Sequence, residues 1–162
     1  HFRHHEVVGA RMTKKILKGL KYDNKTIKDI SLLVEQHLRP HTFKMGWTDS
    51  AVRRYIVDAG HMLEDLNQLV RADVTTKNKT KAKEIYDNLD EMEKRIEEVK
   101  AKEELSKIRP ALSGDEIMKH FNIQPGPKVG VIMKALYEQR INDGEVSKEE
   151  ALQLAEETFK NL

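Results

Sequence analysis

The chain contains no cysteine and no long hydrophobic run, and each absence removes a class of protein. Without cysteine, the 162 residues carry no disulfide framework and no Cys-ligated zinc or iron–sulfur site, which fits a reducing compartment. No stretch reaches the roughly 18 apolar residues that a membrane helix needs, and the first residues do not form the apolar core of a signal peptide. We therefore expect a soluble, cytoplasmic protein with no membrane partner.

Aromatic residues and net charge are also scarce. Only 6% of the residues are aromatic whereas 35% are charged, which is typical of a helical protein with long water-exposed faces. The net charge of +2 does not indicate a nucleic-acid partner by itself, because phosphates are attracted to local clusters of cations. Two such clusters are Arg3, Arg11, Lys14, Lys15, Lys18 and Lys21, and Lys77, Lys79, Lys81 and Lys83. For either cluster alone, a solvated helix face is the simpler interpretation.

The spacing of apolar residues predicts an all-α protein. No apolar/polar alternation of the kind found in strands occurs, so we expect no sheet. Apolar residues recur every four positions from Val8 to Leu20 and predict an amphipathic helix over about 5–20. A second helix is expected to begin with Asn24 as its cap and to end before Pro40.

Further helices are predicted in the middle of the chain. Thr48 and Asp49 can cap a helix that Gly60 ends, and a buried stripe follows over 63–73. From 79 to about 105, apolar residues step by four and three among Glu and Lys, which predicts a long helix. Its partner is an antiparallel helix of the same chain or, alternatively, a second copy in a short coiled coil.

The best linker is Ile108-Arg109-Pro110, which divides the chain into a helical body over 1–108 and a small helical tail over 109–162. In the tail, turn signals predict helices at about 114–121, 127–142 and 148–160. The signals are two capping boxes with S-x-x-E spacing and one proline in a first turn: Ser113 with Glu116, Ser147 with Glu150, and Pro127.

Motifs for catalysis are missing. The sequence has no P-loop, no dinucleotide-binding glycine motif, no nucleophile elbow and no zinc-protease helix. It also lacks the Asp-x-Asp pair that two-metal nucleotidyl transfer needs to hold its ions. We expect no catalytic residue in this chain and no autonomous polymerase.

One constellation can carry metal chemistry. His5, His37 and Asp73 are the candidate ligands, since imidazoles and a carboxylate from three helices can bind a divalent ion. His37 and Asp73 fall on apolar faces, where an ionisable group needs a partner. The simpler alternative is a buried structural hydrogen bond between these two, with His4, His5 and His41 at a partly exposed rim.

Aromatic and guanidinium groups occur together at Trp47 and at Arg53-Arg54-Tyr55, as they do in proteins that bind single strands. A Trp beside a helix cap is more often a packing anchor, and that interpretation stays open beside the first.

Residues 112–144 resemble the tail of bacterial CCA-adding tRNA nucleotidyltransferases. The pattern G-x-E-I-M, then I-x-P-G-P-x-V-G, then a helix closing at D-G combines uncommon turn residues at fixed offsets. Upstream, residues 2–10, 47–55 and 71–79 are similar to the actinobacterial branch of the same CCA-adding and poly(A) polymerase family. The resemblance therefore covers nearly the whole chain.

The resemblance implies an HD-type helical body followed by a tail that grips tRNA. In such enzymes an N-terminal head adds CTP and ATP residues to the tRNA 3′ end with Mg²⁺, so we expect the parent to be an enzyme and this chain alone to be inactive and without a cofactor. The chain opens with His1, and the head, the neck and the His-Asp dyad of the HD motif are expected upstream. His5, His37 and Asp73 match later positions of the HD pattern.

The expected partner is tRNA, held through backbone shape and charge without reading of sequence, with no DNA binding and with homo-oligomerisation left open. The candidate RNA contacts are Lys77, Lys79, Lys81, Arg109, Lys128 and Lys134. One alternative is a metal-dependent HD-type phosphohydrolase domain, which a bound metal would favour. The other is a helical interaction module built on the 79–105 helix, which would bind a protein or a second copy and have no affinity for tRNA.

Overall fold

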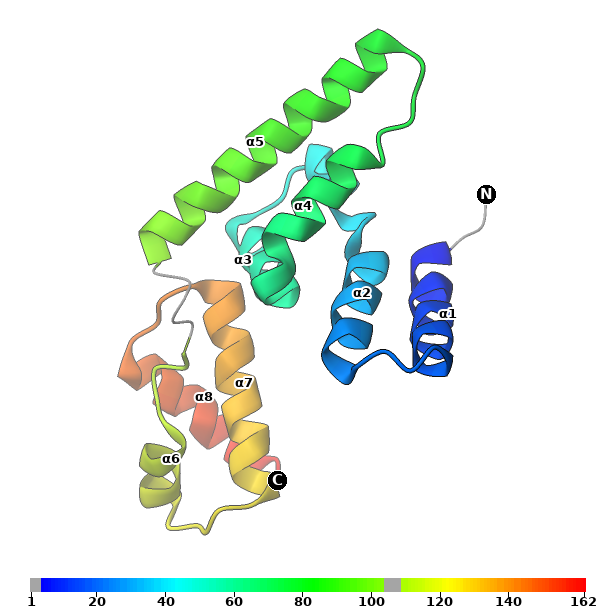
Figure 1. Cartoon of the computed structure of the whole chain (residues 1–162). Coiled ribbons are helices and arrows are strands. Elements are labelled where there is room, and N and C mark those ends of the chain that lie inside the picture. The colour runs from blue at the N-terminus through cyan, green and yellow to red at the C-terminus, as the bar shows by residue number, and fades with distance from the viewer. Residues whose placement is uncertain (1–3, 104–108) are drawn as a thin grey trace. The chain divides into compact units, whose positions relative to one another are not determined.

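The computed structural model describes residues 4–103 and 109–162, and every regular element in those ranges is a helix (Figure 1). The all-α prediction is therefore confirmed. The α-helices and the two short 3₁₀ helices (η) are α1 His5–Gly19, α2 Asn24–Gln36, η1 Arg39–Met45, α3 Asp49–Ala59, η2 Gly60–Met62, α4 Leu63–Ala72, α5 Lys79–Glu103, α6 Gly114–Phe121, α7 Pro127–Asp143 and α8 Lys148–Lys160. Among the described helices, none combines the length and apolar character that a bilayer crossing requires.

The described residues form two compact units. The first contains the residues up to Thr48 together with Tyr55–Ile96, and the second contains Asp49–Arg54 together with the described residues from Glu97 to Leu162. Helices α3 and α5 thus contribute residues to both units. Ile108 of the predicted linker and the predicted end of the long helix near 105 lie outside the described residues.

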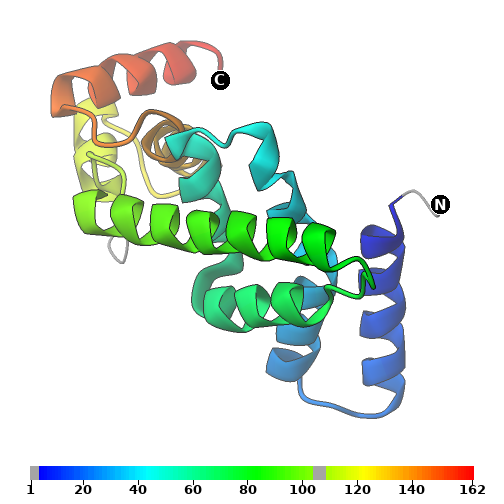
Figure 2. The ribbon, with the colours of Figure 1, turned by 90° about the horizontal axis from the view of Figure 1, so that it is seen from above.

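In the first unit, α1 and α2 lie side by side as an antiparallel pair (Figures 1 and 2). Asp23 caps α2: its carboxylate accepts hydrogen bonds from the Thr26 main-chain N–H at 2.9 Å and from the Thr26 hydroxyl at 2.6 Å. The predicted cap, Asn24, is instead the first helical residue. Both residue types cap well, but the negative charge of Asp23 also complements the positive end of the helix dipole.

The apolar residues that predicted α1 do not form its buried face. Against α2 the helix buries small residues: Ala10 is buried, and a Cβ placed on Gly9 would lie 3.1 Å from Val34 Cγ1. The apolar side chains that recur every four residues are instead between 52% and 64% exposed. They are Val8, Met12, Ile16 and Leu20, which we call the α1 ridge.

Helices α4 and α5 lie side by side and antiparallel, as Figures 1 and 2 both show. Arg71 of α4 joins them through ion pairs with Asp90 at 2.6 Å and Glu93 at 2.7 Å. Buried side chains of both helices lie along this pair: Leu66, Val70, Leu89, Met92 and Ile96. The long helix therefore has the antiparallel partner from its own chain that we expected.

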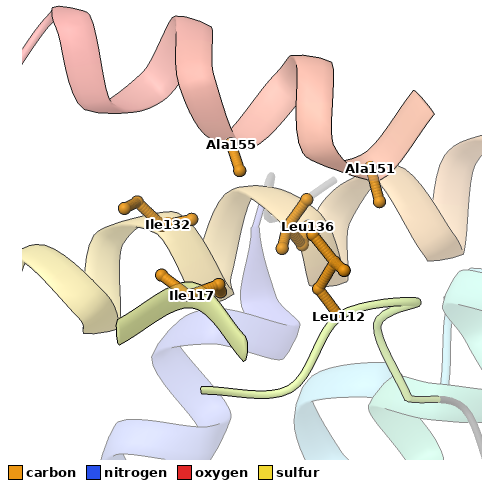
Figure 3. Packing of buried hydrophobic residues seen from close by; sticks show 6 residues of the cluster. All are labelled: Leu112, Ile117, Ile132, Leu136, Ala151 and Ala155. Atoms are coloured by element: carbon orange, nitrogen blue, oxygen red, sulfur yellow. The ribbon is translucent and has the colours of Figure 1, made fainter. Parts of the chain in front are cut away.

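The second unit has its own core, built by α6, α7 and α8 (Figure 3). Its buried members are Leu112, Ile117, Ile132, Leu136, Ala151 and Ala155. The two alanines are the residues of α8 in this core, and their small side chains let α8 approach α7 closely.

All three tail helices were predicted within one residue of their observed ends. Both capping boxes are formed, Pro127 begins α7, and Gly144 ends it with φ of 84°, a conformation that favours glycine.

Replacing Leu136 by alanine should destabilise the second unit by about 3 kcal/mol, because the side chain is 1% exposed and its loss leaves a cavity between α7 and α8. Urea unfolding followed by circular dichroism measures the change. Val131→Ala on the same helix is the control, since Val131 is 45% exposed and its truncation should cost less than about 0.5 kcal/mol. Equal losses for both variants would contradict the assignment of Leu136 to the core.

Candidate nucleic-acid interface

Two adjacent arginines of α3 hold the carboxyl-terminal end of α7 within the second unit. Arg53 is 6% exposed, and its guanidinium donates hydrogen bonds to the main-chain carbonyls of Ile141 and, at 2.9 Å, of Asn142. Arg54 forms a bidentate ion pair with Glu138, in which Nη1 lies 3.2 Å from Oε1 and Nη2 lies 2.5 Å from Oε2. This pair lowers the pKa of the Glu138 carboxyl. A cation at the carbonyl end of a helix is also favoured by the helix dipole. These guanidinium groups are therefore engaged in structure.

The aromatic residues beside these arginines are packing anchors as well. Trp47 packs its ring 5.7 Å from Phe43 and 5.3 Å from Tyr55, and its indole N–H donates to the Thr42 hydroxyl at 3.0 Å. Tyr55 is fully buried, its hydroxyl donates to Asn67 Oδ1 at 2.7 Å, and burial raises its pKa. Of the two interpretations that the sequence left open, the structural one is confirmed.

The lysines at the start of α5, unlike the ion-paired arginine of α3, have no carboxylate partner among the described residues. Lys77, Lys79 and Lys81 are all exposed, and none of them forms an ion pair with any residue that the structure describes. The next lysine, Lys83, pairs with Asp87 at 2.6 Å. Three of the candidate RNA contacts thus lie together on a cationic segment whose charge the described residues leave unneutralised.

This cationic segment works against the helix that it opens. Asn78 caps α5, since its side-chain oxygen accepts the Lys81 main-chain N–H at 3.1 Å. The amino end of a helix carries partial positive charge, so the cations of Lys79 and Lys81 in its first turn are mildly destabilising there. Helix stability therefore does not explain why lysines occupy these positions.

The remaining candidates belong to the second unit. Lys128, at the start of α7, places its Nζ 5.4 Å from the centre of the Phe159 ring, a cation–π contact that joins α7 to α8. Lys134 is exposed on α7 one turn before Glu138, and its charge adds a small part to the lowering of the Glu138 pKa. Arg109 is exposed just ahead of α6.

The proposed metal ligands do not come together as one set. The rings of His5 and His37 lie 5.7 Å apart, and His37 Nδ1 donates to the Val34 carbonyl at 2.7 Å. Asp73 is exposed, so the expected buried pair of His37 with Asp73 is wrong: α4 ends at Ala72, and Asp73 leaves the buried face there. In the ranges 4–103 and 109–162, no group of three or more His, Asp or Glu side chains is placed to hold a metal ion.

Residues 7–155 match the family model described as tRNA nucleotidyltransferase domain 2. The chain belongs to this family of tRNA nucleotidyltransferases. Over 141 residues it is 30% identical to the A-adding tRNA nucleotidyltransferase of Deinococcus radiodurans. The aligned region covers 86% of this chain and 31% of that protein. Over 150 residues it is 31% identical to the CC-adding tRNA nucleotidyltransferase of Thermus thermophilus, covering 93% of this chain and 32% of that protein.

This tRNA nucleotidyltransferase domain therefore spans about a third of the length of the curated relatives that it matches. No solved structure gives a significant match. The family match covers most of both compact units and all six candidate RNA contacts, from Lys77 to Lys134.

Sequence reasoning overlooked one polar cluster of the nucleotidyltransferase domain. Asp29 of α2 is buried and pairs with Lys25 at 2.9 Å and with His61 of η2 at 3.1 Å. The hydrogen bond from Lys25, and then that from His61, lowers the pKa of Asp29. The spacing of Lys25 and Asp29 is a recognisable helical ion pair, but nothing in the sequence connects either residue to His61.

A second polar link joins α6 to α8. Glu116 completes the capping box of α6 and also accepts a hydrogen bond from Lys148 at 2.7 Å. These contacts, the one from Lys148 first and those from Ser113 next, lower the pKa of Glu116 to about 2.

The Glu116 contacts predict a pH dependence of stability. A carboxyl group with a lowered pKa stabilises the fold above its ordinary value of 4.5, and this contribution disappears as the pH falls through about 2. In urea unfolding, wild type should be more stable than Glu116→Gln at pH 7, and the difference should shrink steadily below pH 4.5.

The control is Glu157→Gln on α8, because Glu157 is exposed and pairs with no cation among the described residues. The free energy of unfolding of Glu157→Gln should stay close to that of wild type at every pH. If Glu116→Gln lowers the free energy of unfolding equally at pH 7 and near pH 2, the stabilising role of the Glu116 carboxylate is contradicted.

Proposed function

We propose that this chain is the tRNA-binding part of a tRNA nucleotidyltransferase whose catalytic head lies outside residues 1–162. In this proposal the chain is an HD-type helical body and tail of the actinobacterial, CCA-adding type. The whole enzyme then adds CTP and ATP residues to the tRNA 3′ end in the cytoplasm.

The family match and the short span of the chain relative to its relatives support this division of labour. The names of the two relatives, one A-adding and one CC-adding, support nucleotide addition to tRNA as the activity of the whole protein. The sequence has no Asp-x-Asp pair, so the proposal assigns Mg²⁺, CTP and ATP to the head.

The single observation that carries the RNA-binding role is the cationic segment at Lys77, Lys79 and Lys81. Two later lysines of α5 are neutralised within the helix, Lys83 by Asp87 and Lys100 by Glu97 at 2.8 Å. The segment at the start has no such partner among the described residues. Phosphates supply the missing negative charge, and an A-form RNA backbone is recognised through charge and shape.

The cations of the second unit would contact the same backbone. Lys128 and Lys134 on α7 and Arg109 ahead of α6 are exposed, and each can reach a phosphate without breaking an ion pair with a described residue. Their contribution is expected to be smaller than that of the α5 segment, because Lys128 is also held over the Phe159 ring.

A salt-titrated tRNA-binding assay tests the proposal on the triple variant Lys77→Gln, Lys79→Gln and Lys81→Gln. If each lysine neutralises one phosphate, the slope of log affinity against log salt should fall by about 2–3 relative to wild type. The matched control is Lys83→Gln, Lys100→Gln and Lys148→Gln, which removes the same charge from three lysines that already have carboxylate partners.

The control variant should keep the larger part of the wild-type slope. Equal losses in the two triple variants would show that only net charge matters and would reject the α5 segment as a binding site. Double-stranded DNA of the same length bound as tightly as tRNA would reject the tRNA-binding function itself.

A further inference from the structure

Helix α1 has one face that is clearly occupied. Gly9 and Ala10 lie against α2, and a Cβ built on Gly9 would lie 3.1 Å from Val34 Cγ1, so a larger residue would crowd the Val34 side chain. The small residues on this face let the two helices pack closely. The occupied face also holds the half-buried Leu17, whereas Val8, Met12, Ile16 and Leu20 stay exposed.

Those large side chains form the α1 ridge on another face. Val8, Met12 and Ile16 follow one another every four residues along α1, so that consecutive members are neighbours on the helix surface, and Leu20 comes directly after the helix end. Each of the four is more than half exposed. Single exposed apolar residues are ordinary on protein surfaces, but a continuous row of them marks a contact surface. The other large exposed apolar residues lie outside α1: Tyr22, Ile30, Met45, Leu69, Tyr86, Val131 and Leu162.

A basic face borders the ridge. Arg11, Lys14, Lys15 and Lys18 are exposed on α1, and none of them pairs with a carboxylate within the described ranges. On a helix of 3.6 residues per turn, Arg11 and Lys15 come directly beside Val8 and Met12. A complementary surface would therefore present an apolar stripe with an acidic border.

A second copy packed antiparallel on the ridge does not meet this requirement. Two α1 ridges packed antiparallel about a two-fold axis would bring the basic border of one copy against the same border of the other. Like charges placed opposite each other oppose association.

A segment of the same polypeptide outside residues 1–162 is the other candidate occupant. The chain spans about a third of the length of its curated relatives, so a relative of that length has most of its residues outside this domain. A segment of the same polypeptide also has a high effective concentration at the ridge, which a separate partner lacks.

We propose that the α1 ridge is the docking surface for an amphipathic, acid-bordered helix from the part of the nucleotidyltransferase outside residues 1–162. The inference rests on the proposed function only in taking the protein to be longer than this chain. Docking makes α1 an internal boundary of the whole enzyme and leaves Arg11 and Lys15 paired with acidic residues of that helix.

The absence of cysteine from residues 1–162 allows a direct test. Single variants Ile16→Cys and Met12→Cys place a thiol on the ridge, and Lys14→Cys places one on the basic face of the same helix. Each is made in the 162-residue chain and in the full-length protein, and the rate of reaction with a water-soluble maleimide is read by mass spectrometry of the α1 peptide.

In the 162-residue chain all three thiols should react readily. In the full-length protein the Ile16→Cys and Met12→Cys rates should fall at least about tenfold, as a buried interface requires, whereas the Lys14→Cys rate should change much less. Using two ridge positions keeps the test decisive if one of the variants does not fold.

Equal ridge rates in the two proteins would overturn the proposal. Protection that occurs in the 162-residue chain and grows with its concentration would overturn it in favour of a second copy. The same variants are assayed for tRNA binding: protected thiols in a protein that does not bind tRNA would reject the proposed function and keep the docking surface.

Discussion

The second unit depends on the buried cation of Arg53. The Arg53 guanidinium stays charged at any pH that a protein meets, so its burial is tolerable only if its N–H groups find acceptors. The carbonyls of Ile141 and Asn142 at the end of α7 are such acceptors, and they would otherwise be left without helical partners themselves. Removing one side of a buried, charged contact of this kind typically costs about 3–5 kcal/mol. This contact explains why the first turns of α3 belong with the tail helices, far away in sequence.

The tail helices were predictable from the sequence because their signals are local. A capping box involves residues three positions apart, and the proline of α7 acts through its own ring, so both work without knowledge of any other element. The fold class was predictable for the same reason, since helical periodicity is present in nearly every segment. The cap of α2 was misplaced by one residue because Asp23 and Asn24 are both good caps, and only the geometry at Thr26 decides between them.

The errors concern which side of a helix is buried and which distant residues meet. The periodicity of α1 showed an apolar face but not that α2 would pack against Gly9 and Ala10 instead. Asp73 followed the stripe of α4 in register, but the helix ends one residue earlier. His61 reaches Asp29 through the path of the chain between α2 and η2, which no local pattern encodes. For the candidate interface, the sequence identified the cationic segment of α5, whereas the lack of carboxylate partners around it in the described residues required coordinates.

The position of Arg53 also governs the order in which the second unit can form. Arg53 and its acceptors on α7 are separated by 88 and 89 positions, so a growing chain holds this arginine without its native acceptors until α7 has been synthesised. Closing so long a loop is entropically costly, and the contacts that repay the cost come late. A boundary drawn at the linker near Arg109 would likewise leave the carbonyl end of α7 without its guanidinium. The unit is therefore defined by a long-range contact, and a chain that contains the tail helices alone lacks part of it, the segment Asp49–Arg54.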